Sequence, residues 1–399
     1  MYNRRDVRPP LLLSAAVAVL IVWGLLTVFN TSSAEVIDRL QMRSTHAALF
    51  KQTLFAGVGV LLCLTCWRRG IDLLLRRPWW LWGVTVALLV CCWVPGIGMA
   101  ANGAHRWLRL GSISLQPSEI AKIALPFLMV AWCRASAIQN WRSFLLCMAP
   151  IIVPIFLVLL EPDNGTTLIM LFEVTLLLFL LRVPAKYWAM PMAVVCLVGA
   201  ALAWQMPHVH RRLEVYLNPE LDLRGKGHQP YQARIAVGSG GLYGRGLGQG
   251  LQKLEYLPEA QNDYIAAIVA EETGFLGMLS LIACYCCILL SGAWIGLRQL
   301  RPELRALAVS LSCVLVVQAC LNLGVVSGVF PSTGINLPLF SQGGSSLLCN
   351  LALVGWLLHI AVPIQRPSSA SIEHSLKARR GSLSGFSRIH WREKPNTLA

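Results

Sequence analysis

The chain has 399 residues, of which 56% are hydrophobic and only 13% are charged, and its formal net charge is +15. A soluble protein of this length would carry about a quarter charged residues, so the composition argues against a soluble enzyme and indicates an integral membrane protein. The positive charge does not indicate a nucleic-acid partner, because the basic residues lie mainly in short segments between apolar runs.

Ten apolar runs, each near the length that crosses a bilayer, follow one another along the chain. They are residues 10–30, 47–67, 79–98, 117–134, 143–160, 166–182, 187–206, 268–297, 304–328 and 344–363. The predicted fold class is therefore all-α, a polytopic membrane protein with about ten transmembrane helices. We expect a cytoplasmic segment at 1–9, a membrane domain at 10–363 and a basic cytoplasmic tail at 364–399, whose composition predicts disorder.

The distribution of arginine and lysine predicts the orientation of these helices. Most arginine and lysine residues fall in the segments on one side of the membrane. The short loops on the other side hold only Arg39, Arg43, Arg106 and Arg109. Because basic residues in short loops favour the cytoplasm, both termini are expected inside and the long loop between the seventh and eighth spans, residues 207–262, outside. The basic residues near the membrane also suit anionic lipid headgroups.

Four polar segments then face outward: residues 102–122, 161–165, 207–262 and 329–346. Their convergence at one face predicts an extracytoplasmic active site. The second of them, EPDNG, is typical of a tight turn between two helices. All 13 cysteines lie within or at the edges of the apolar runs, which argues against a disulfide framework and against a metal site with ligands on the loops.

The segment QPSEIAK, Gln116–Lys122, predicts the start of a helix, with Ser118 as its cap and Glu119 in its first turn. Glu119 and Lys122 share one face of that helix, so a local ion pair is one interpretation. The alternative is that Lys122, deep in a span, faces a polar cavity and holds an anionic headgroup together with Arg106.

A glycine-rich run, Gly238–Gly250, lies in the long loop. Its backbone N–H groups could bind phosphate oxygens, but the pattern of an ATP-binding P-loop is absent and no strand is expected before it. We expect instead a tightly folded or re-entrant loop. Arg245 lies within it and Lys253 follows it, and both could contact a diphosphate.

Asp263 stands where the eighth apolar run begins, and it fits two roles. It could cap the helix, the role that the residues alone favour, or act as a general base whose pKa rises at the boundary of water and hydrocarbon. Glu271 and Glu272 follow on the same span, about 12–14 Å further along a helix. They are too distant to pair with Asp263 and are expected to support or gate the site.

Four motifs of the chain resemble those of the SEDS family (shape, elongation, division and sporulation), which includes FtsW, RodA and SpoVE. The motifs are GAHRW with QPSEIAK, GSGGLYGRGLGQGLQKLEYLPEAQNDYIAAIVAEETG, NLGVVSGVFPSTGINLPLFSQGGSSL and, more weakly, FKQTLF. The wording QKLEYLPEA is more similar to the division-type branch, FtsW, than to the elongation-type branch, RodA. The family commonly has HTDF where this chain has QNDY and SYGGSS where it has SQGGSS, and neither difference affects Asp263.

The resemblance implies a peptidoglycan glycosyltransferase that polymerises lipid II, the undecaprenyl-diphosphate-linked disaccharide pentapeptide, at the outer face of the bacterial inner membrane during division. It implies that Asp263 is the catalytic residue and that Arg106 and Lys122 contribute to activity. The remaining candidate substrate contacts are Glu119, Arg245, Lys253, Ser345 and Ser346.

The resemblance also implies partners, namely a class B penicillin-binding protein that crosslinks the new strand and other proteins of the division complex. A divalent cation could assist the reaction, although no carboxylate cage is evident in the sequence. Three alternatives remain open: a lipid II flippase, an elongation-type polymerase, and a non-enzymatic scaffold for a division complex.

Overall fold

The computed structural model describes residues 4–38, 47–101, 104–111, 113–135, 138, 140–205, 214, 216–222, 227–253 and 261–362. Residues up to Ala361 form one compact unit. The expected tail at 364–399 and part of the expected loop at 207–262 lie outside the described residues.

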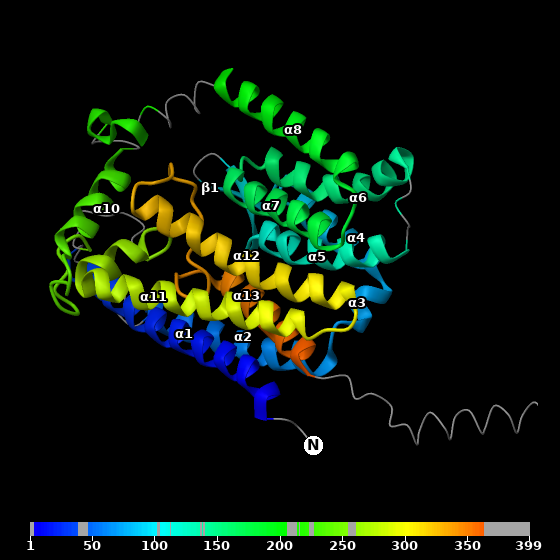
Figure 1. Cartoon of the computed structure of the whole chain (residues 1–399). Coiled ribbons are helices and arrows are strands. Elements are labelled where there is room, and N and C mark those ends of the chain that lie inside the picture. The colour runs from blue at the N-terminus through cyan, green and yellow to red at the C-terminus, as the bar shows by residue number, and fades with distance from the viewer. Residues whose placement is uncertain are drawn as a thin grey trace, which may run out of the picture. The chain divides into compact units, whose positions relative to one another are not determined.

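Among the described residues, ten long helices overlap the ten predicted apolar runs, and Figure 1 shows how they are arranged. They are α1 (Arg4–Asp38), α2 (Ala47–Arg69), α4 (Pro78–Cys91), α5 (Pro117–Ala135), α6 (Trp141–Leu160), α7 (Asn164–Leu180), α8 (Ala185–Gln205), α11 (Ile265–Leu297), α12 (Pro302–Val326) and α13 (Gly344–Ala361). Among the described residues, α1, α2, α6, α11, α12 and α13 are long and apolar enough to cross a membrane. The prediction of a helical, multi-pass membrane protein is confirmed, whereas the number of crossings and their orientation stay predictions.

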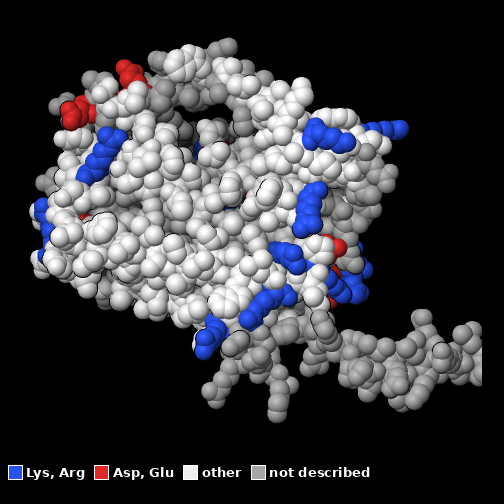
Figure 2. Space-filling model, in the orientation of Figure 1, with Lys and Arg blue, Asp and Glu red and all other residues white. Residues whose placement is uncertain are grey.

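The helices carry apolar side chains outward and polar ones inward, as a protein surrounded by lipid does. Phe50, Phe179 and Leu297 are among many large apolar side chains that are exposed. On the face shown in Figure 2, lysine and arginine lie mainly toward the two ends of the helices, and the wide surface between them is almost free of charge. This charge-free surface is what a bilayer would cover.

Several smaller elements lie between the helices and were not predicted. A three-stranded antiparallel sheet, β1 (Gly98–Ala101), β2 (Ala104–Leu110) and β3 (Ile113–Leu115), joins α4 to α5. The others are α3 (Asp72–Arg76), a 3-10 turn at Pro219–Asp222 and α10 (His228–Ser239). The third apolar run, expected to continue to residue 98, ends as a helix at Cys91 because the chain turns there into the sheet.

Helix α11 is broken at Gly274, whose φ of 65° and ψ of −161° are not helical. The break divides α11 into a first segment, residues 265–273, and a second segment, residues 275–297. A positive φ costs glycine little and a residue with a side chain much more, so glycine suits this position. The peptide groups around the break need other partners, because their helical hydrogen bonds are interrupted.

The segment that follows α10, residues 240–253, which we call the glycine-rich loop, supplies those partners. Four backbone hydrogen bonds join it to the broken helix: Arg245 N to Glu271 O (3.0 Å), Gly246 N to Glu272 O (3.0 Å), Phe275 N to Gly241 O (2.9 Å) and Leu276 N to Leu242 O (3.2 Å). The two backbones lie so close that side chains would collide. A Cβ added to Gly240 would lie 2.0 Å from Ala270 O, and one added to Gly244 would lie 2.1 Å from Glu272 O. The expected tightly folded loop is confirmed, and these glycines permit close packing on α11.

Candidate active site

Asp263 lies two residues before α11 begins, at the end of the helices that we call the Asp263 end. Its backbone carbonyl accepts a hydrogen bond from Asn322 Nδ2 on α12 at 2.7 Å. A Cβ added to Gly334 would lie 3.7 Å from Asp263 Oδ2, so the carboxylate faces the loop between α12 and α13. The capping interpretation is wrong as stated, because Tyr264 and not Asp263 occupies the N-cap position.

Lys122 is buried in α5, with a side chain that is 1% exposed. Its ammonium donates a 2.9 Å hydrogen bond to Glu119 Oε2 and a second hydrogen bond to Gln318 Oε1 of α12. The expected ion pair between Glu119 and Lys122 is therefore confirmed. Because a buried ammonium is costly unless its donors are satisfied, this pairing explains how Lys122 is accommodated inside the helix bundle.

The start of α5 differs from the prediction. The helix begins at Pro117, whose fixed φ suits the first helical position, so Ser118 lies within the first turn and is not the cap. The Ser118 hydroxyl instead donates to Asp163 Oδ2 at 3.1 Å, and Gln116 Nε2 donates to the same oxygen at 3.1 Å. These bonds attach the start of α5 to the start of α7.

Two amide side chains of α12 connect the Lys122 and Asp263 positions. Gln318, which accepts from Lys122, donates through Nε2 to Asn336 O at 3.0 Å. Asn322, which donates to Asp263 O, also donates to Ile335 O at 2.7 Å. Lys122 and Asp263 are thus both joined to neighbouring residues of the same loop. Neither amide was among the predicted site residues, although polar residues four apart within an apolar span are a signal of function.

Arg106 lies on β2 and contacts the turn between α6 and α7. Its Nε donates to Glu161 O at 3.0 Å, and its Nη2 donates to Pro162 O. The predicted tight turn is confirmed, since α6 ends at Leu160 and α7 begins at Asn164. The sheet was not expected, so the element that carries Arg106 was not predicted.

The side chain of Glu161 in this turn is buried. The residue is 0% exposed, and neither carboxyl oxygen has a partner among the described residues. Burial, together with the negative charge of Asp163, raises the pKa of Glu161 to about 8, although Cys92 and Arg106 act in the opposite direction. Its carboxyl group is therefore mostly protonated near pH 7.

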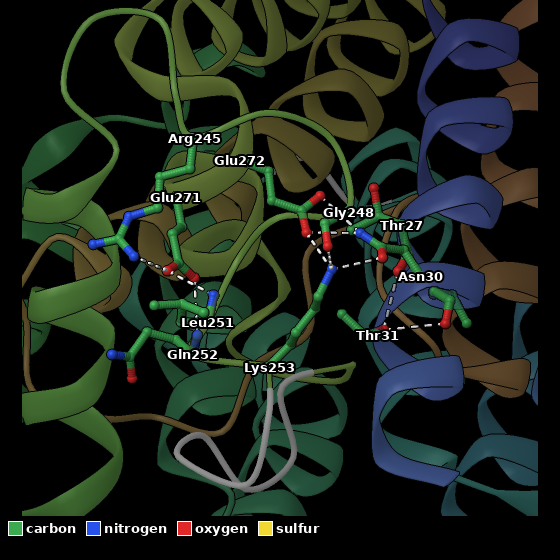
Figure 3. Close-up of polar contacts among 11 residues, drawn as sticks. Thr27, Asn30, Thr31, Arg245, Gly248, Leu251, Gln252, Lys253, Glu271 and Glu272 are labelled. Atoms are coloured by element: carbon green, nitrogen blue, oxygen red, sulfur yellow. Dashed lines mark hydrogen bonds and ion pairs between the residues drawn. The ribbon is translucent and has the colours of Figure 1, made fainter. Parts of the chain in front are cut away.

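A second cluster lies where α1 meets the glycine-rich loop (Figure 3). Lys253 Nζ donates to Asn30 Oδ1 at 2.8 Å, to Gly248 O at 2.7 Å and to Glu272 Oε1 at 2.7 Å. Asn30 Nδ2 donates to both carboxylate oxygens of Glu272, at 2.8 and 2.7 Å. The side chains of Lys253 and Glu272 are 5% and 4% exposed. We call Asn30, Lys253 and Glu272 the Lys253 cluster.

Glu271 binds the same loop from the neighbouring position. Its two carboxylate oxygens accept from Leu251 N at 2.9 Å and from Gln252 N at 3.1 Å. Arg245 lies 3.7 Å from Glu271 Oε1, and its side chain is 38% exposed. The expectation that Glu271 and Glu272 support the site agrees with these contacts, since both carboxylates hold the glycine-rich loop (Figure 3).

The candidate residues thus divide into two groups. The contacts of Lys122 and Glu119 lie in the interior between α5 and α12, whereas those of Arg245 and Lys253 lie on α11 and α1. The last two candidates, Ser345 and Ser346, are buried in the first turn of α13. Ser346 Oγ accepts a hydrogen bond from Asn350 Nδ2 at 3.3 Å. Within the described ranges, no group of three or more His, Cys, Asp or Glu side chains could hold a metal ion.

The fold and these contacts define a multi-pass membrane protein with separate clusters of polar contacts among its helices. The chain belongs to the family of cell cycle proteins that comprises FtsW, RodA and SpoVE, whose family model matches residues 11–365. The family expected from the sequence is therefore confirmed.

Named relatives share most of the chain. A probable peptidoglycan glycosyltransferase FtsW from Legionella pneumophila is 36% identical over 354 residues, which cover 87% of this chain and 89% of the relative. The stage V sporulation protein E of Bacillus subtilis is 34% identical over 361 residues, covering 88% and 97%. The FtsW relatives are named as probable peptidoglycan glycosyltransferases, which is the enzyme class expected from the sequence.

Solved structures have the same fold. The Thermus thermophilus rod shape determining protein RodA matches with a TM-score of 0.62 and 26% identity, covering 89% of this chain and 97% of that one. A chain from a study of how a peptidoglycan synthase complex coordinates polymerization and crosslinking matches with a TM-score of 0.70 and 26% identity, covering 88% and 96%.

Proposed function

We propose that this protein is a peptidoglycan glycosyltransferase that polymerises lipid II at the outer face of the bacterial inner membrane during septal wall synthesis. The names of the FtsW relatives support the enzyme class and the septal role. The observation that carries the proposal is the connection of Asp263 and Lys122, through Asn322 and Gln318, to one loop. These bonds hold the backbone of Asp263 and the ammonium of Lys122 beside one loop, which supports a shared site for the carboxylate and the cation.

In the proposed reaction, Asp263 is the general base. Its carboxylate removes the proton from a sugar hydroxyl of the acceptor lipid II, and the resulting oxygen attacks the anomeric carbon of the donor glycan. The bond from that carbon to the lipid diphosphate breaks, and the diphosphate leaves with the electron pair. An α-linked donor gives a β-linked product in one displacement, so no covalent enzyme intermediate is needed.

Three cations would offset the charge that develops on the leaving diphosphate. Lys122 has a hydrogen-bonded, fixed position, and Arg106 has a planar fork suited to phosphate oxygens. Arg245 is more exposed and only loosely paired with Glu271, so it keeps donors for an anion. For Lys253 we propose a different role below, because its three donors already have acceptors.

The proposed partner is a class B penicillin-binding protein that crosslinks the new strand, acting with other division proteins. Support comes from the structural neighbour, whose study concerns polymerization and crosslinking by one synthase complex. A polymerase needs a transpeptidase close by, because uncrosslinked strands do not strengthen a wall.

The test is lipid II polymerisation by the purified protein, with and without a candidate partner, using wild type, Asp263→Asn and Glu220→Gln. Glu220 is an exposed acid in the same long loop and is the matched control. General base catalysis contributes about 10²–10⁴-fold, so Asp263→Asn should lose at least about 100-fold in rate while Glu220→Gln stays near wild type. Polymer formation by Asp263→Asn at the wild-type rate would overturn the assignment of the base.

A lipid II flippase is the second candidate, and buried charges within the helices favour it. Lys122 lies inside the bundle, and Glu173 of α7 is fully buried; among the described residues only one of its oxygens is hydrogen-bonded, to Ser310 Oγ at 3.1 Å. Such residues also mark transport paths. Sealed vesicles separate the two functions: a flippase moves labelled lipid II across the bilayer, whereas a polymerase makes long chains from substrate supplied on the correct face. Translocation without polymer would favour the flippase.

A further inference from the structure

The first segment of α11 is short and separated from the rest of the helix. It spans residues 265–273, which is about two and a half turns, and it ends at the break at Gly274. Helices this short are not stable without tertiary contacts. Asp263 lies at the start of this segment, so whatever fixes the segment also fixes Asp263.

The break gives any tilt of the segment a large effect on Asp263. Eleven residues separate Asp263 from Gly274, which corresponds to about 16 Å along a helix. A tilt of about 4° at the break would move Asp263 by about 1 Å at that distance. A misplacement of about 1 Å can lower the rate of a reaction by up to about 100-fold.

The Lys253 cluster holds this segment at its other end, next to the break. Glu272 lies two residues before Gly274, and it accepts hydrogen bonds from Asn30 on α1 and from Lys253 in the glycine-rich loop. Helix α1 packs along α11, so it provides a long and stable support. The cluster therefore joins the first segment to two other parts of the chain.

The polar groups of Lys253 and Glu272 all have hydrogen-bond partners. An ammonium has three donors, and those of Lys253 go to Asn30, Gly248 and Glu272. Both oxygens of Glu272 are also bonded. Burying such a pair adds little net stability compared with apolar packing, so its benefit is defined geometry. No donor of Lys253 is left for a diphosphate, which argues for a role in positioning.

We propose that Asn30, Lys253 and Glu272 are positioning residues, which hold α1 and the glycine-rich loop against the first segment of α11 and thereby set the position of Asp263. The proposal rests on the proposed function for its kinetic consequence. Its structural consequence, a fixed first segment, is independent of the reaction.

The test compares Asn30→Ala with Thr31→Ala in the full-length protein. Thr31 is the next residue on α1 and is buried, and in the described part of the chain its hydroxyl bonds only to carbonyls of its own helix, at 3.0 and 3.1 Å, so it is the matched control (Figure 3). Asn30→Ala should lower kcat for lipid II polymerisation by about 10-fold with KM changed less than about twofold. Thr31→Ala should change neither parameter by more than about twofold.

A second measurement is hydrogen exchange of the peptides covering residues 265–273. Asn30→Ala should speed their exchange relative to wild type, and Thr31→Ala should not. If the wild type makes no polymer, the proposed function fails while the exchange measurement still decides the positioning role. If the wild type polymerises and Asn30→Ala matches Thr31→Ala in both kcat and exchange, the positioning role is wrong.

The coupling between members of the cluster provides a further check. Lys253→Met combined with Glu272→Met removes both charges and both groups that bond to Asn30, so no buried charge is left alone. Adding Asn30→Ala to this double variant should lower kcat by less than about twofold, because the contacts of Asn30 are already lost. A full 10-fold loss on that background would show that Asn30 acts through something other than the cluster.

Discussion

The Lys253 cluster and the turn between α6 and α7 both bury a carboxyl group near the Asp263 end, but the two carboxyl groups differ in their hydrogen-bond partners. Glu272 has an ammonium and an amide as partners, and each of its oxygens is hydrogen-bonded. Glu161 is equally buried, and neither of its oxygens has a partner among the described residues.

The difference indicates which group is charged and what each contributes. A carboxylate with charged and amide donors stays ionised, and its removal leaves a buried ammonium without a partner. A buried carboxyl group that accepts no hydrogen bond from a charged or amide donor avoids the cost of burying charge by keeping its proton, in agreement with the raised pKa of Glu161. Glu272 is therefore a fixed structural contact, whereas the charge of Glu161 changes with pH.

Among the single substitutions, Glu272→Ala should have the largest effect on the free energy of unfolding. It removes the only carboxylate bonded to Lys253 in the described residues, so the free energy of unfolding should fall by about 3–5 kcal/mol. Chemical unfolding in detergent micelles measures the change. Adding Lys253→Met to this variant should recover part of the loss, because the lone ammonium is then gone. A loss below about 1 kcal/mol would mean that the pair is not held as described.

The pH dependence of stability tests the turn. The pKa of Glu161 rises from 4.5 to about 8 on folding, so between these values the folded protein keeps a proton that the unfolded chain releases. The free energy of unfolding should therefore fall as pH rises, by about 1.4 kcal/mol per pH unit, with the loss complete above pH 8. Glu161→Gln should remove this slope, and an equal slope in both proteins would contradict the assignment.

The helices of this fold could be predicted from the sequence because each apolar run is long and bounded by polar residues. The sheet was missed although it left a signal. Gly111 and Ser112 separate Leu110 from Ile113, which pair across the hairpin, and a two-residue turn with glycine is typical of that arrangement. The expectation of an entirely polar loop in this region concealed the signal.

The role of the glycines could not be predicted, because the surface they approach is supplied by another part of the chain. Gly240 and Gly244 are needed where the loop meets α11, and the sequence does not show that contact. The Lys253 cluster has the same origin, since Asn30 and Glu272 are 242 residues apart. Sequence motifs identified Asp263 and Lys122 as candidates, whereas the contacts that connect them through Gln318 and Asn322 are visible only after folding.

Arg245→Ala has the smallest expected effect on stability and separates support from substrate contact. Arg245 is 38% exposed and lies 3.7 Å from Glu271, which keeps its two backbone donors in the variant. The free energy of unfolding should change by less than about 1 kcal/mol. If Arg245 contacts the diphosphate, KM for lipid II should rise by about 10-fold, as expected for the loss of one charge-assisted hydrogen bond. Unchanged KM together with a large loss of stability would instead assign Arg245 to the supporting contacts of Glu271.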